Sequence, residues 1–370
     1  MLGRLRLGPP SLRGRKFPEP PHPYRNEFQR DRDRVIHSRA FRRLEGKTQV
    51  FAAGLHDHFR NRLIHTIEVS QVARTVAVAL QLNEEYAETL ALAHDLGHPP
   101  FAHVGEKELN RQMQRFGSGF EHNRQALRIV DLLEQRYARF DGLNLTFEVR
   151  EGIVKHSREV GADAESELQE LMPGKRPPLE AQLIDIADEI AYNTADVDDA
   201  FTGGLFSIEQ IGEAVPAFAE LAEAADTQFP GAPERIRFWE IQRHLMNVLV
   251  GGLVHGTTQA AEAAGVQSVE DVRDLDYRLA RLTPEAEEIN RQLKGLLIAR
   301  VYSYAQLVED RSAAVNKLKL LFEYFMDNPE QVAPTYRERL GDEPVHRVVC
   351  DYIAGMTDTY LLRTYRELLG

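Results

Sequence analysis

The chain has 370 residues and a formal net charge of −12, and 43% of its residues are hydrophobic and 28% are charged. This length and composition are typical of a soluble globular protein with one large core or two moderate ones. No apolar run reaches the roughly 18 to 20 residues of a membrane helix, so we expect no membrane partner. Cys350 is the only cysteine, which excludes an internal disulfide and a thiolate zinc cluster and favours a cytoplasmic location.

Positive charge is concentrated near the N-terminus. Residues 1–47 contain thirteen Arg and Lys against five Asp and Glu, which leaves a charge of −20 on the remainder. A basic segment on an acidic body suits an acidic ligand, an acidic neighbouring subunit or single-stranded nucleic acid. Residues 1–23 are rich in Pro and Arg and are predicted to form a flexible basic arm, for which a solvated tail is the simpler interpretation.

From Asn26 the pattern is helical almost to the C-terminus. The first long helix is expected over 59–80, where an apolar stripe is formed by Ile64, Val69, Val72, Val76 and Leu80. His65 lies four residues before one member of this stripe, so its ring should point inward.

The next predicted helix begins at Asn83, a favourable N-cap residue. It should stop at Gly97, because Pro99 and Pro100 cannot continue a helix. His94 and Asp95 therefore fall in its last turn.

Further helical patterns follow. The segment LNLTFEV (143–149) alternates like a strand but could equally be an extended lead into a helix. Pro177 and Pro178 begin a helix that ends at Gly203 and Gly204, and later helices are expected over 236–249, 284–304, 313–326 and 345–369. We therefore predict an all-α fold divided at the double glycine into 1–23, 24–202 and 203–370, with the last region packed on the second.

A shared metal ion is the simplest explanation for several polar residues that these helices turn inward. They are His65, the pair His94 and Asp95, and Asp188, which interrupts the apolar sequence LIDIADEIAY. A buried, unpaired carboxylate is costly, so three helices that bring such groups inward need a common partner. Two imidazoles and two carboxylates suit Mn, Fe, Co, Ni or Mg.

The motifs resemble one family in both content and order. They are RDRDRVIHSRAFRRLEGKTQVF (30–51), RNRLIHTIEV (60–69), HDLGHPPFAHVGE (94–106), FEHN (120–123), EGIVKHS (151–157), ADEIAYNTADVDDAF (187–201) and DYIAGMTD (351–358). This order is similar to that of HD-domain deoxyguanosine triphosphate triphosphohydrolases (dGTPases) from Tyr24 to the C-terminus. The resemblance implies a helical HD core over 24–202, an associated C-terminal helical region, and hydrolysis of a deoxynucleoside triphosphate (dNTP) to deoxynucleoside and triphosphate.

The resemblance also implies roles for individual residues. The metal ligands are His65, His94, Asp95 and Asp188. His103 is the proton donor, Glu106 orients its ring, and His122 is a third active-site histidine. Residues implied at the triphosphate are Arg43, Arg62 and His98, with Lys155 a weaker candidate. Tyr192 and Asp196 follow Asp188 at helical spacing and are implied at the sugar. His98 and His122 have a structural alternative, as histidines that pack the PPFAH loop, and Arg39, Arg42 and Lys47 could be ordinary surface charges.

Several alternatives remain open. Other HD proteins hydrolyse cyclic nucleotides, nucleoside monophosphates or alarmones, and a nucleotide sensor or single-strand nucleic-acid binder is a further alternative from a different class. His103 and Glu106, with Tyr192 and Asp196, favour triphosphohydrolysis. Glu189 replaces a lysine of vertebrate relatives, and no residue type indicates the preferred base. The resemblance also implies a homo-oligomer, a hexamer or tetramer, with a dNTP effector at a second site.

Overall fold

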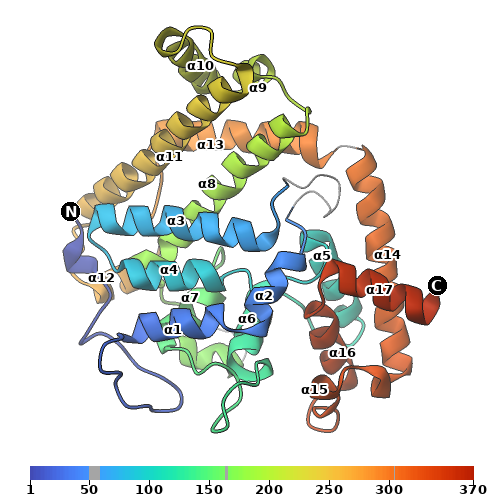
Figure 1. The fold of residues 1–370 in the computed structure, drawn as a ribbon. Helices are drawn as coiled ribbons and strands as arrows, with labels where there is room; N and C mark the ends of the chain where they lie inside the picture. The colour runs from blue at the N-terminus through green and yellow to red at the C-terminus, as the bar shows by residue number, and fades with distance from the viewer. Residues whose placement is uncertain (50–58, 163–165, 304) are drawn as a thin grey trace. The chain divides into compact units, whose positions relative to one another are not determined.

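The protein is described by a computed structural model that covers residues 1–49, 59–162, 166–303 and 305–370, with side chains outside 305–311. Within these residues the ordered elements are helices, and β pairing is limited to isolated bridges (Figure 1). The predicted all-α fold is confirmed.

The α-helices are α1 (Glu27–Ile36), α2 (Arg39–Arg43), α3 (Arg62–Leu80), α4 (Glu84–Ala93), α5 (Ala102–Gln114), α6 (His122–Arg128), α7 (Phe147–Val154), α8 (Leu179–Thr202), α9 (Ile208–Ala214), α10 (Pro216–Gln228), α11 (Glu234–Ala264), α12 (Val269–Asp274), α13 (Pro284–Leu297), α14 (Ala305–Asp327), α15 (Pro334–Arg337), α16 (Val345–Ala354) and α17 (Asp358–Leu369). The shorter elements are the 3-10 helices η1 (Gly3–Leu5), η2 (Leu44–Gly46), η4 (Ser166–Leu171) and η6 (Pro329–Gln331) and the π-helical turns η3 (Ile129–Leu133) and η5 (Ile298–Tyr302).

The chain forms two compact units, each assembled from separate stretches of sequence. Unit 1 contains residues 1–13, 67–91 and 155–304, and unit 2 contains residues 14–66, 92–154 and 305–370. The division of the sequence into 1–23, 24–202 and 203–370 stays a prediction.

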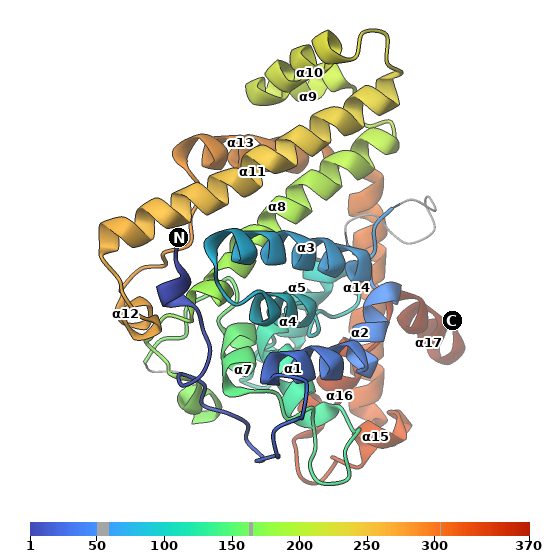
Figure 2. The ribbon, with the colours of Figure 1, turned by 60° about the vertical axis from the view of Figure 1, so that its left-hand side comes forward.

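Unit 1 is built around the long helix α11, which packs against α8, α10 and α13 (Figure 2). Its buried face carries Phe238, Ile241, Leu245 and Leu249 at helical spacing. The first residues of the chain belong to this unit, and their Leu2, Leu5 and Leu7 are fully buried. The Pro- and Arg-rich composition did not predict this burial.

Unit 2 contains an apolar core between α5, α14 and α16. Leu109 and Met113 of α5 meet Leu318 and Phe322 of α14, with Ile353 of α16 in the same cluster. This core fixes α5, the helix that carries two of the predicted active-site residues.

Helix α3 largely follows its predicted pattern. Four members of the predicted stripe are buried, namely Val69, Val72, Val76 and Leu80. Ile64 is 44% exposed, so the prediction that it belongs to the buried stripe was wrong. Five residues separate Ile64 from Val69, which turns it about 140° from the stripe at 100° per residue, whereas His65 lies on the stripe. By length and composition α3 is apolar enough to cross a membrane, but half of its apolar window is buried inside the protein, and a single helix of this kind is weak evidence for a membrane span.

Two further segments differ from the sequence pattern. The alternating segment 143–149 contributes only an isolated bridge between Thr146 and Arg15, after which α7 begins at Phe147. The helix expected over 345–369 is two helices, α16 and α17, separated at Gly355. Thr357 caps the second helix, because its side chain accepts a hydrogen bond from the amide of Tyr360.

Candidate metal centre and active site

Two helix ends in unit 2 supply the core of the site. His65 lies in the first turn of α3, and His94 and Asp95 follow the last residue of α4 in a turn that ends at Gly97. A Cβ atom at Gly97 would lie 1.9 Å from the carbonyl oxygen of His122, so only glycine allows this turn to approach α6.

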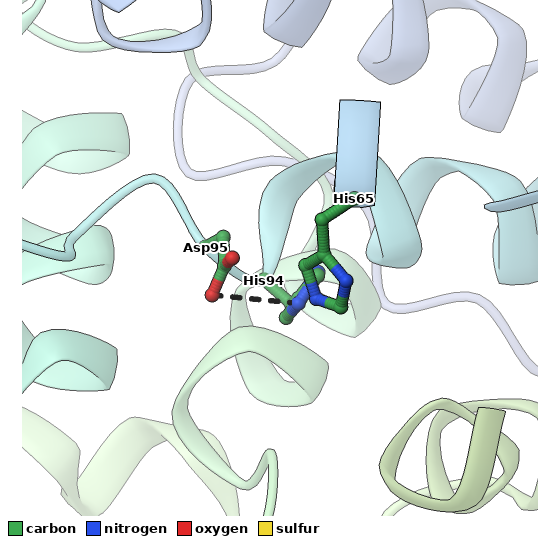
Figure 3. A group of neighbouring side chains, drawn as sticks. All are labelled: His65, His94 and Asp95. Carbon is green, nitrogen blue, oxygen red and sulfur yellow. Dashed lines mark ion pairs between the residues drawn. The ribbon is translucent and has the colours of Figure 1, made fainter. Parts of the chain in front are cut away.

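Three predicted metal ligands come together there. His65, His94 and Asp95 each offer a ligand atom, and these atoms all lie within 4.8 Å of one another. The His65 and His94 rings meet edge to face with centroids 5.9 Å apart, and His94 Nε2 lies 3.4 Å from Asp95 Oδ1 (Figure 3). All three residues are buried. Two imidazole nitrogens and a carboxylate oxygen form a donor set that fits a divalent cation.

Arg62 neutralises the carboxylate of this group. Its Nη1 donates to Asp95 Oδ2 over 2.7 Å, and both side chains are almost fully buried. Burial would raise the pKa of Asp95, but the Arg62 guanidinium, then His94 and His98, lower that pKa well below its ordinary value. The carboxylate is therefore ionised, which is the form that a metal ligand requires.

The fourth predicted ligand, Asp188, belongs to α8 in unit 1. Its Oδ2 lies 3.8 Å from Nε2 of His156, whose Nδ1 lies 2.8 Å from Asp185 Oδ1. Sequence reasoning missed His156. The motif EGIVKHS contained it, but nothing in the spacing indicated that it would meet α8. The role of Asp188 as a ligand stays a prediction.

A second polar group in unit 2 contains the predicted proton donor. His103 Nδ1 lies 3.3 Å from Glu106 Oε2, one helical turn along α5. The other carboxylate oxygen accepts a hydrogen bond from the backbone amide of His122 over 2.9 Å and lies 2.7 Å from its Nδ1. Burial would raise the pKa of Glu106, but hydrogen bonds from His103 and His122 lower it far below its ordinary value. Glu106 is thus an ionised carboxylate shared by two histidines.

His98 joins this group from the loop that follows the turn with His94 and Asp95. Its ring centroid lies 4.0 Å from that of His122 and 5.4 Å from that of His103. Burial lowers the pKa of His98 well below its ordinary value, and Arg62 lowers it further, so the imidazole is neutral. The His103 side chain, in contrast, is 69% exposed and open to a substrate.

The backbone just before His103 adopts an unusual conformation. Phe101 and Ala102 have φ angles of 63° and 54°, in the left-handed region that residues with a Cβ rarely adopt. The Asp358 carboxylate holds this segment, because Oδ1 accepts a hydrogen bond from the Phe101 amide over 3.1 Å. Its Oδ2 accepts a hydrogen bond from the Thr48 amide over 3.0 Å. Sequence reasoning recognised DYIAGMTD as a motif but assigned no role to its last residue.

Lys47 is a second residue that connects the loop before α5 to the C-terminal segment. Its ammonium donates to the carbonyl oxygens of His98 and of Ala354, the latter over 3.1 Å. The side chain is 3% exposed, so its interpretation as a surface charge was wrong. Burial lowers the pKa of Lys47 to about 7, with Arg62 and Arg43 adding to the effect. Val50 and Phe51, the last two residues of the motif over 30–51 that contains Lys47, lie outside the described residues.

The predicted phosphate residue Arg43 also contacts the C-terminal segment. Its Nη1 donates to the carbonyl oxygen of Gly355 over 2.9 Å. Lys155, the weaker phosphate candidate, is buried in unit 1, where its ammonium donates to the carbonyl oxygens of Met172 and Lys175. These bonds give Lys155 a structural role that the sequence did not indicate.

The residues predicted at the sugar lie along α8 in unit 1. Asp196 is buried and accepts a hydrogen bond from the hydroxyl of Tyr302 over 2.5 Å, and the rings of Tyr302 and Tyr192 lie 6.0 Å apart. Burial and the neighbouring Asp196 raise the pKa of Tyr302 far above its ordinary value, so the phenol keeps its proton. Glu189 pairs with Lys294 over 2.7 Å. The roles of Tyr192 and Asp196 stay predictions.

The helical fold and the His65, His94 and Asp95 group define a class, the HD-domain metal-dependent phosphohydrolases. Residues 62–193 match the HD domain family, and residues 280–367 match the family described as "Phosphohydrolase-associated domain".

Similar proteins occur in several bacteria. Relatives from Ralstonia nicotianae and Azoarcus sp. are 45% and 46% identical over 97% of this chain and 92% and 94% of their own lengths. A relative from Caulobacter vibrioides is 43% identical over 97% of this chain and 94% of its own. Each is named "Deoxyguanosinetriphosphate triphosphohydrolase-like protein". The chain belongs to this family of HD-domain proteins, as its motifs predicted.

Proposed function

We propose that this phosphohydrolase cleaves dNTPs to the deoxynucleoside and inorganic triphosphate. The observation that carries the proposal is the presence, in one unit, of a buried group of side chains that could hold a metal ion and of the His103, Glu106 and His122 group. The names of its relatives support a nucleoside triphosphate substrate.

The metal would be held by His65, His94, Asp95 and Asp188. Their nitrogen and oxygen donors suit Mn, Mg, Fe, Co or Ni. When bound, such an ion polarises a phosphoryl group and lowers the pKa of a nearby water. The ion pair with Arg62 keeps Asp95 ionised before any ion arrives.

His103 would act as the general acid. Water attacks the α-phosphorus, the bond from phosphorus to the 5′ oxygen breaks, and His103 gives its proton to the departing oxygen, because a bare alkoxide is a costly leaving group at neutral pH. The ionised Glu106, 3.3 Å from Nδ1, orients the ring and balances the positive charge of its protonated form. Asp358 holds the backbone at Phe101 and thus sets where α5 begins, one residue before His103.

Substrate contacts follow from charge and shape. A triphosphate needs cationic partners besides the metal, and Arg62 and Arg43 are the assigned cations, with the neutral His98 as a further phosphate contact. Tyr192 would pack against the sugar and Asp196 would accept its 3′-OH. Close packing at this point would exclude a 2′-OH and select deoxyribose over ribose.

We further infer a cytoplasmic homo-oligomer, a hexamer or tetramer, that binds a dNTP effector at a second site. The basic residues 1–47 favour a contact with single-stranded nucleic acid.

Product analysis tests the proposed activity. Purified protein is incubated with Mn²⁺ or Mg²⁺ and with each dNTP, alone and mixed, and the products are separated by ion-pair chromatography. We expect deoxynucleoside and intact triphosphate in equal amounts. Diphosphate with orthophosphate, or no turnover in any mixture, would contradict the proposal and favour another HD phosphohydrolase or a nucleotide-binding protein.

A further inference from the structure

Unit 2 contains a second compact group of metal-binding side chains. His98, His103 and Glu106 each offer a ligand atom, and the three atoms lie within 4.8 Å of one another. The group shares no ligand with His65, His94 and Asp95. Its members have so far been assigned to proton transfer and phosphate binding.

With Asp188 as its proposed fourth ligand, the first centre has two carboxylates, whereas this group has two imidazoles and a single carboxylate. Two imidazoles and one carboxylate, with a water, form the tetrahedral set of many zinc sites, in which ligand atoms about 2 Å from the ion lie roughly 3.3 to 3.5 Å apart. His103 Nδ1 and Glu106 Oε2 are 3.3 Å apart. Two of the three donors are therefore already spaced for Zn²⁺.

His98 completes the set. Its Nδ1 lies 2.9 Å from Asp95 Oδ1, and its Nε2 is buried and makes no hydrogen bond within the described part of the chain. A histidine whose one nitrogen faces a carboxylate has a fixed ring orientation and a more basic second nitrogen, which is the usual arrangement of a metal-binding histidine.

Access to the group is open on one side. The His103 side chain is 69% exposed, whereas those of His98 and Glu106 are 4% and 18% exposed. An ion from solvent would meet His103 first and then the two more buried ligands. The site therefore needs no opening of the fold to load.

We propose that His98, His103 and Glu106 form a second, inhibitory site for Zn²⁺. The inhibition rests on the proposed function, because an ion bound to His103 removes the proton donor. Mn²⁺ at the first centre would support turnover, and Zn²⁺ at the second would stop it.

Zinc binding is measured directly, without any substrate. The full chain is freed of metal by chelation and dialysis and given one equivalent of Mn²⁺, and Zn²⁺ is then titrated in competition with a chromophoric chelator. Released Mn²⁺ is counted in the same titration, because Zn²⁺ can displace Mn²⁺ from nitrogen and oxygen ligands. We compare the wild type with His103→Ala and Glu106→Gln, and use His37→Ala, an exposed histidine of the same unit, as the control.

Beyond any Zn²⁺ that replaces Mn²⁺ one for one, the wild type and His37→Ala should bind one further Zn²⁺. His103→Ala and Glu106→Gln should bind it at least about tenfold more weakly, because each loses one of three ligands. Equal Zn²⁺ affinity in all four proteins would overturn the proposal.

Inhibition is tested separately. In the wild type with dNTP and excess Mn²⁺, the Zn²⁺ concentration that halves turnover should match that of the binding titration while one Mn²⁺ per chain stays bound. Turnover unaffected at full Zn²⁺ occupancy, or inhibition only where Zn²⁺ has displaced Mn²⁺, would contradict inhibition through the second site. A chain that binds the second ion but hydrolyses no dNTP would contradict the proposed function and leave the zinc site standing.

Discussion

Asp358→Asn tests how the fold positions His103. The carboxylate accepts hydrogen bonds from the amides of Phe101 and Thr48. Asparagine has a single acceptor oxygen, so its NH₂ group would face one of these amides, and one charge-assisted hydrogen bond would be lost. Such bonds contribute about 1.5 to 3 kcal/mol.

The free energy of the lost hydrogen bond is comparable to the backbone strain that this bond offsets. A left-handed conformation costs about 1 to 2 kcal/mol for a residue with a Cβ, and both Phe101 and Ala102 adopt it. Without the bond the segment should relax, and His103 should move with it. If the whole free energy of the lost hydrogen bond stabilised the catalytic position of His103, turnover should fall about 10- to 150-fold, at about 1.4 kcal/mol for each factor of ten.

The assay is steady-state hydrolysis of a dNTP mixture with Mn²⁺. We expect a lower kcat, a KM within about twofold of the wild type, since the phosphate ligands are unchanged, and the same Mn²⁺ content. Asp342→Asn, an exposed residue of the same unit, is the control and should change nothing.

A second substitution separates positioning from a general loss of stability. Adding Ala102→Gly to Asp358→Asn removes the strain at Ala102, because glycine adopts positive φ readily, and should restore part of the lost turnover. Turnover of Asp358→Asn within about twofold of the wild type, or no gain from Ala102→Gly, would refute the reasoning.

Three further predictions concern the ligands, the ion pair and a buried acid. His103→Ala should keep its Mn²⁺ and lose turnover, whereas Asp188→Ala should lose Mn²⁺ by elemental analysis; the reverse pattern would contradict the assigned roles. Arg62→Ala should lower the free energy of unfolding by about 3 to 5 kcal/mol in urea denaturation, because Asp95 would stay buried without its guanidinium partner; a change below about 1 kcal/mol would argue against a buried pair.

Burial raises the pKa of Glu180, so the folded chain binds this proton more tightly than the unfolded chain, and the stabilisation is lost as pH rises through the folded pKa. Urea titrations between pH 8 and pH 5 should therefore show the wild type gaining stability relative to Glu180→Gln as pH falls, by at most about 1.4 kcal/mol per pH unit; the opposite slope would contradict the assignment.

The grouping of His65, His94 and Asp95 was predictable because its signals are local. Helical periodicity turns His65 inward, and the two prolines after Gly97 end the helix next to His94 and Asp95. The structure brings these three residues together. The order of the motifs identified the family, and two glycines marked the end of α8.

The residues that hold the site in place were not predictable in the same way. Lys47 lies in a basic stretch, which is typical of surface charges, and only the packing of distant segments shows that it is buried. Left-handed backbone is normally signalled by glycine or asparagine, and Phe101 and Ala102 give no such signal. Asp358 meets Phe101 across 257 positions of sequence, a pairing that no local pattern encodes.

The N-terminal leucines illustrate the same limit. Leu2, Leu5 and Leu7 have neither helical nor strand periodicity, yet they are fully buried. The backbone amide of Leu7 donates to Glu180, and that of Leu2 donates to the carbonyl oxygen of Leu80. Long-range hydrogen bonds of this kind place the segment, and composition alone favoured a mobile arm.

The presence of a divalent ion on His65, His94 and Asp95 is the claim on which the proposed activity rests. Its most direct test is elemental analysis of the chain after equilibrium dialysis against Mn²⁺, for the wild type, His94→Ala and the control His37→Ala. We predict one ion per chain in the wild type and the control and close to none in His94→Ala, with all three folded by circular dichroism. A folded wild type without bound metal, or a His94→Ala variant that binds as much as the wild type, would contradict the account.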